Sequence, residues 1–102
     1  MKMWNCFMMD YINGELGSVE SYGIFSSLEE GVENILKAHQ VGHRHKEADD
    51  EDDVCWFVDE NKACFFVDGV IHGWDITLRN ICNSKEEETV FFHLERHEVD
   101  KG

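Results

Sequence analysis

The sequence predicts an α+β fold, an antiparallel sheet of about five to six strands with one helix packed on one face. Three observations predict it. One segment has apolar residues at helical spacing, and in the segments after it apolar and polar residues alternate, as in strands, between turn residues. The expected helix also has one apolar face, which a sheet can cover. The 102 residues suffice for a single domain, 1–102, because two halves would each be too small to bury a core.

The first element is a strand at residues 3–12, which is apolar on both alternating faces. A strand of this kind is typical of the interior of a sheet rather than its edge. Asn13-Gly14 follows, and this dipeptide is a frequent hairpin turn. We therefore expect a second, short strand around Val19–Phe25.

The clearest element is a helix from about Ser27 to Val41. Ser26 and Ser27 each have a glutamate three residues later, which is the capping-box pattern. Gly42 is well placed to end the helix. Gly31 is expected to weaken it by roughly 1 kcal/mol relative to alanine. The apolar face consists of Leu28, Val32, Ile35, Leu36 and His39.

Residues 43–53 form an acidic and histidine-containing connector without apolar periodicity, and the sequence leaves open whether it is ordered. Strands are expected beyond it, with a tight hairpin at Glu60–Lys62 and a two-residue hairpin turn at Asp68-Gly69. Gly73 is a candidate for a β-bulge that re-aims Trp74. The expected strands are Val54–Asp59, Ala63–Val67, Val70–Trp74, Ile76–Ile81 and Thr89–Val99.

The charge distribution is the main indication of function. The net charge is −13, and residues 47–102 contribute sixteen acids against five Lys and Arg. Such a field repels nucleic acids and anionic lipid, and favours a basic protein surface or a cation. We therefore expect no direct binding to nucleic acid or membrane. The absence of an evident export signal or membrane span predicts a cytoplasmic protein.

The leading functional hypothesis is a small acidic protein–protein binding module without enzymatic activity or cofactor. It would occlude the basic nucleic-acid-binding site of a nuclease-type enzyme, as anti-defence (anti-CRISPR) inhibitors of phages and toxin-immunity proteins do. Carboxylates can replace phosphates in a groove lined by Lys and Arg, and exposed aromatic residues can act as anchors. The candidate contact residues are Asp49, Asp50, Glu51, Asp52, Asp53, Trp56, Trp74, Glu86, Glu87 and Glu88.

Two alternatives stay open. A metal-binding or catalytic domain could use His39, His43 and His45, and a second weak metal candidate places His93 and His97 on one strand face beside Glu95. The sequence has no Gly-x-Ser-x-Gly elbow, glycine-rich phosphate loop or His-Glu-x-x-His motif that would support an enzyme. The other alternative is a homo-oligomeric structural protein, a homodimer for example, that pairs through outward aromatic residues.

The four cysteines are expected to be reduced thiols in the core. Their spacing contains no Cys-x-x-Cys pair, which zinc sites normally show, and each has apolar neighbours. A free buried cysteine behaves as a small hydrophobic residue.

Overall fold

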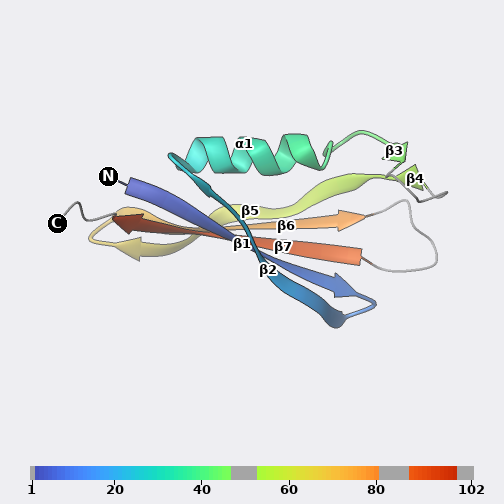
Figure 1. Ribbon diagram of the computed structural model, residues 1–102, viewed down its shortest axis with the longest axis horizontal. Helices are drawn as coiled ribbons and strands as arrows, with labels where there is room; N and C mark the ends of the chain where they lie inside the picture. Colours follow the sequence, from blue (N-terminus) through green and yellow to red (C-terminus); the bar gives the residue numbers. More distant parts are fainter. Residues whose placement is uncertain (1, 47–52, 81–87, 99–102) are drawn as a thin grey trace.

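The computed structural model describes residues 2–46, 53–80 and 88–98, and the side chains of residues 45, 46 and 53 are not described (Figure 1). Within these ranges there is one five-stranded antiparallel sheet in the order β2-β1-β7-β6-β5, a two-stranded ladder of β3 and β4, and one helix. The predicted α+β class with an antiparallel sheet and one helix is thus confirmed. The elements are β1 Lys2–Ile12, β2 Glu15–Phe25, α1 Leu28–Ala38, β3 His45–Lys46, β4 Asp53–Val54, β5 Trp56–Val67, β6 Val70–Asn80 and β7 Glu88–Glu98.

Two hairpins are closed by the turns that the sequence predicts. Asn13 and Gly14 have φ of 53° and 81°, and Asp68 and Gly69 have φ of 50° and 78°. Two consecutive residues with positive φ form the type I′ turn, whose twist matches that of the flanking strands. Because this turn needs only two residues, β2 pairs with β1 from Glu15 onward and is longer than expected. β1 lies between β2 and β7, as its apolar faces predict.

The predicted hairpin at Glu60–Lys62 is wrong. β5 continues through these residues, which pair with Thr77, Ile76 and Asp75 of β6. None of the three is a glycine and none has a positive φ, so they extend the strand rather than turn it. The register instead shifts at three points along β5, which absorbs the irregular spacing of its side chains.

The helix begins as predicted and ends earlier. The hydroxyl of Ser27, the N-cap, accepts a hydrogen bond of 3.1 Å from the Glu30 N–H. At the other end Gln40, directly after the C-cap His39, takes the left-handed conformation with φ of 48°, and Gly42 also has a positive φ, 85°, two residues further on. The Val41 N–H donates to the Leu36 carbonyl at 3.0 Å, which satisfies a carbonyl of the last turn. Gly42 donates instead to the carbonyl of Trp56 at 2.8 Å.

The buried core contains residues of both α1 and the strands. Gly31 makes the contact between them close: a Cβ there would lie 2.5 Å from Cδ2 of Leu94 and 3.1 Å from Phe25. The Tyr22 hydroxyl donates to Oδ1 of Asn34 and links β2 to the helix at its exposed edge. The buried apolar residues are Trp4, Cys6, Ile35, Val54, Trp56, Ile76, Leu78, Val90, Phe92 and Leu94.

Strand alternation divides the sheet into two faces. We call the side bearing Ile76, Phe92 and Leu94 the core face, and the opposite side, bearing Asp75 and His93, the outer face. No helix among the described residues is long and apolar enough to span a membrane.

Candidate functional site

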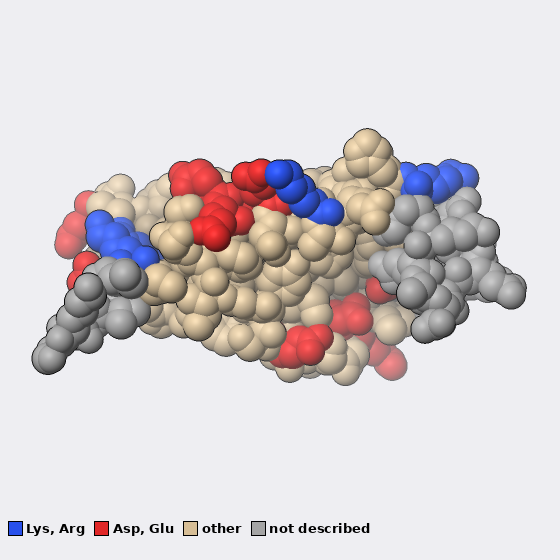
Figure 2. Space-filling model, turned by 45° about the horizontal axis from the view of Figure 1, so that its top comes forward, with Lys and Arg blue, Asp and Glu red and all other residues tan. Residues whose placement is uncertain are grey.

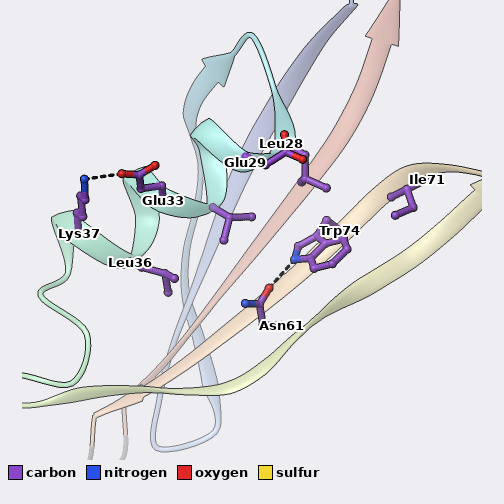
Figure 3. A pocket seen from close by; sticks show the side chains of 9 residues that line it. Leu28, Glu29, Glu33, Leu36, Lys37, Asn61, Ile71 and Trp74 are labelled. Atoms are coloured by element: carbon purple, nitrogen blue, oxygen red, sulfur yellow. Dashed lines mark hydrogen bonds and ion pairs between the residues drawn. The ribbon is translucent and has the colours of Figure 1, made fainter.

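A groove of about 680 Å³ lies beside α1, where the helix faces strands β5 and β6 (Figure 3). Its helical wall consists of Leu28, Val32 and Leu36, which follow one another at intervals of four residues and so share one side of the helix. Ile71 and Trp74 of β6 form the opposite wall. The groove is therefore an apolar channel between two secondary-structure elements.

Trp74 holds a fixed position in this groove. Its indole N–H donates a hydrogen bond to Oδ1 of Asn61 on β5, as Figure 3 shows. Across the ladder its partner on β5 is Ala63, which has a small side chain. The ring is half-buried, so one apolar surface faces the groove. Of the two tryptophans predicted as anchors, Trp74 is thus available to a partner.

The helical edge of the groove is acidic. Glu29 and Glu33 line it and are exposed, and Lys37 is its one cation among the described residues that form the groove. Lys37 forms an ion pair with Glu33, which holds the pKa of Glu33 below its ordinary value. Figure 2 shows acidic side chains gathered on the side of the molecule that carries α1. An apolar channel with an acidic edge can accept apolar groups accompanied by positive charge.

The predicted acidic contact residues fall mostly outside the described residues. Asp49, Asp50, Glu51 and Asp52 lie there, and so do Glu86 and Glu87. Asp53 is in β4, paired with Lys46 of β3, and Glu88 is half-buried at the start of β7. Whether these acids share a surface with the groove therefore stays a prediction.

The expectation that Trp56 is exposed is wrong. Only 3% of Trp56 is accessible, and the ring lies at the start of β5 with its side chain on the core face. It contacts His39 edge-to-face at 6.0 Å between ring centroids. Because side chains alternate along β5, this position points to the core face. Trp56 is therefore buried within the protein itself and does not offer its ring to a partner.

The histidines predicted as metal ligands are not brought together near α1. The Nδ1 of His39 bonds the carbonyl of Ile35 at 2.9 Å, and its ring packs edge-to-face on Phe92. His43 is exposed, and the side chain of His45 is not described. On β7, His97 lies 3.9 Å from a carboxylate oxygen of Glu95, so the predicted same-face neighbours do meet.

A cluster on the outer face escaped the sequence reasoning. Nδ1 of His93 lies 2.7 Å from Oδ1 of Asp75 and 3.9 Å from Sγ of Cys64. The three residues come from β5, β6 and β7, and only strand register shows that they meet. The expectation that all cysteines are core thiols is accordingly wrong for Cys64, which is exposed and free, whereas Cys6 is fully buried.

This cluster differs from a cysteine–histidine–aspartate relay. In a relay the acid and the nucleophile bond opposite ring nitrogens, whereas here both approach Nδ1 of His93. Desolvation and the neighbouring Asp75 raise the pKa of the Cys64 thiol to about 11. A cysteine nucleophile needs a lowered pKa, so this geometry does not activate the sulfur.

Apolar side chains are also exposed at the end of the β5–β6 hairpin. Phe65 and Phe66 are 52% and 56% accessible, and Val67 and Val70 flank the turn. In β7 the adjacent phenylalanines point to opposite faces of the sheet: Phe92 is buried and Phe91 is half-buried.

Compared with models of known protein families, with curated proteins and with solved structures, the chain has no significant match.

Proposed function

We propose that the protein is a small acidic binding module that takes up a basic, amphipathic segment of a partner protein in the groove between α1 and β6. The observation that carries this proposal is the combination of an apolar channel, walled by Leu36 and Trp74, with the exposed carboxylates of Glu29 and Glu33 at its edge. A small neutral ligand would need only the channel. A cationic segment uses both features.

The two features contribute differently to binding. Covering the apolar walls supplies a favourable transfer free energy of about 25 cal/mol per Å² of apolar surface removed from water, part of which is offset by the cost of ordering the partners. A half-exposed tryptophan fixed by a hydrogen bond is a typical interface anchor, because it loses little side-chain freedom on binding. The carboxylates raise the association rate and reject acidic partners.

The groove follows from how the helix meets the sheet. In this proposal α1 covers one face of the sheet, and the cover stops short of the part of β6 that carries Ile71 and Trp74 and of the edge strand β5 beside it. The residue that seats the helix, Gly31, contacts Leu94 of β7 and Phe25 of β2, on the other side of the helix from the groove. Trp74 is then the part of the core face that a partner covers.

The partner class we propose is a nucleic-acid-handling enzyme of the nuclease type, whose basic binding site the protein occludes without catalysis. The net charge of −13 over a molecule 50 Å long is about one charge per 4 Å. That spacing approaches the roughly 3.4 Å between phosphates along one DNA strand. The acids of the run 49–53 and of 86–88 would extend the contact beyond the groove. We propose that the two proteins meet in the cytoplasm.

A titration with two synthetic peptides tests the chemistry of the groove. Both peptides place leucines at helical spacing, one with lysines between them and the other with glutamates. We expect the lysine peptide to shift the indole N–H resonance of Trp74 in a saturable way, with no such shift from the glutamate peptide. The indoles of Trp4 and Trp56 are buried and serve as internal references.

Matched variants separate the groove from the overall charge. Glu29→Gln with Glu33→Gln removes two charges at the groove, and Glu15→Gln with Glu20→Gln removes two exposed charges on β2. The first pair of substitutions should lower the affinity for the lysine peptide severalfold more than the second pair does. Equal weakening by both pairs, or an unmoved Trp74 resonance, would reject the groove as the site.

A further inference from the structure

We propose that Cys64, Asp75 and His93 form a binding site for one zinc-type divalent cation on the outer face of the sheet. Their ligand atoms all lie within 4.8 Å of one another. The site lies on the opposite side of the sheet from Trp74, since Asp75 follows it directly in β6. The inference therefore stands independently of the groove and of any partner.

The distances between the three donor atoms are close to those around a bound zinc ion. With bonds of about 2.0–2.3 Å at tetrahedral angles, two nitrogen or oxygen donors lie about 3.4 Å apart, and sulfur and nitrogen about 3.5 Å. The structure has 2.7 Å between Asp75 Oδ1 and His93 Nδ1, and 3.9 Å between Cys64 Sγ and that nitrogen. Binding would therefore widen one separation and narrow the other by less than 1 Å, which side-chain rotation alone can supply.

Two features of the sheet bring the donors together. Asp75 and His93 are direct partners across the β6–β7 ladder, so their side chains leave the outer face side by side. Cys64 belongs to neither pairing position: the β5 register shifts between Ala63 and Phe65 and leaves it as the extra residue. A bulge of this kind places both Cys64 and Phe65 opposite Gly73, with the thiol on the outer face.

Gly73 provides the room for the thiol. A Cβ at this position would lie 3.0 Å from Sγ of Cys64 and 2.9 Å from Cβ of Phe65. The predicted bulge near Gly73 is therefore on β5 instead of β6, and it directs Cys64 rather than Trp74. A glycine opposite a bulged cysteine lets the sulfur lie close to the sheet, beside the Asp75–His93 pair.

The donor types select the ion. A thiolate, an imidazole nitrogen and a carboxylate are the usual ligands of zinc, whereas calcium and magnesium prefer oxygen ligands throughout. Three protein ligands leave one tetrahedral position open, and both Asp75 and His93 keep a third or more of their side-chain surface in contact with solvent. Water would occupy that fourth position. Among the described residues, Glu95 and Lys62 are close enough to interact electrostatically with the cluster, and Lys62 also pairs with Glu60.

Titration of metal-free protein without a histidine tag tests the site. We expect one zinc ion per chain by calorimetry, and a thiolate-to-metal charge-transfer band when cobalt replaces zinc. Cys64→Ser should abolish the charge-transfer band. Asp75→Asn and His93→Gln should each lower the affinity for zinc at least tenfold. Gly73→Ala keeps all three donors and should still lower the affinity for zinc severalfold, because the new methyl group displaces the thiol of Cys64.

Controls make each outcome decisive. Cys55→Ser and His72→Gln remove the same chemical groups outside the cluster and should leave zinc affinity within twofold. Proton–nitrogen spectra of the bound state should place the imidazole proton of His93 on Nε2, since Nδ1 holds the metal. A folded parent that takes up no stoichiometric zinc would overturn the proposal. So would a Cys64→Ser variant, shown by circular dichroism to be folded, that binds zinc as tightly as the parent.

Discussion

Replacing Gly31 with alanine tests how α1 is seated on the sheet. In an exposed helix this change stabilises by about 1 kcal/mol, because alanine is the better helix former. Here the new methyl group would lie 2.5 Å from Cδ2 of Leu94, a side chain with no accessible surface. An ordinary contact is about 3.5–4.0 Å, so the overlap is about 1.0–1.5 Å and neither partner can move into solvent.

The expected net effect is a loss of stability. Forcing a methyl group into a filled core costs about 1–3 kcal/mol, which outweighs the gain in helix propensity. Gly31→Ala should therefore lower the free energy of unfolding by about 1 kcal/mol, measured by urea denaturation with an unchanged m-value. In a Leu94→Val background, where the clashing carbon is removed, the same change should cost less. The reasoning is refuted if Gly31→Ala stabilises the parent by the full helix-propensity gain.

Three further predictions concern the cap, a core thiol and the acidic run. Ser27→Ala should lower the free energy of unfolding by about 1 kcal/mol, measured by chemical denaturation. Ser27→Asp should keep most of the stability, because its carboxylate can also accept a hydrogen bond from the Glu30 N–H. Burial raises the pKa of Cys6 to about 12, so above pH 9 the unfolded thiol loses its proton first. The free energy of unfolding should then fall as pH rises from 9 to 12. A Cys6→Ala variant whose free energy of unfolding falls equally steeply would contradict this. Converting the acids of 49–53 to amides should slow association with a basic partner at low salt and flatten its salt dependence, and an unchanged rate would count against their role.

The parts of the fold that local chemistry determines could be predicted. Asn13-Gly14 and Asp68-Gly69 are type I′ turns because few residues tolerate two positive φ angles, and both hairpins formed as expected. The Ser27 cap begins the helix for a similarly local reason. Each of these signals is complete within a few residues of chain.

The parts that depend on register could not be predicted. Nothing near Glu60 indicates that β5 runs on to Val67, because its pairing with β6 decides this. The same register brings Cys64 to His93, which is twenty-nine residues away in the sequence. Trp56 was misplaced for the same reason: its residue type suits an anchor, but the face it occupies depends on the whole sheet.

The most direct test of the central claim is a capture experiment that compares two columns. One carries the parent protein and the other carries Trp74→Ala combined with Glu29→Gln and Glu33→Gln, after circular dichroism has shown that the variant is folded. Lysate is passed over both, and bound proteins are eluted with rising salt and identified by mass spectrometry. We predict that the parent alone retains a basic nucleic-acid-handling enzyme, that moderate salt releases it, and that added DNA competes for it. An empty parent column, or the same enzyme held equally by both columns, would contradict the account.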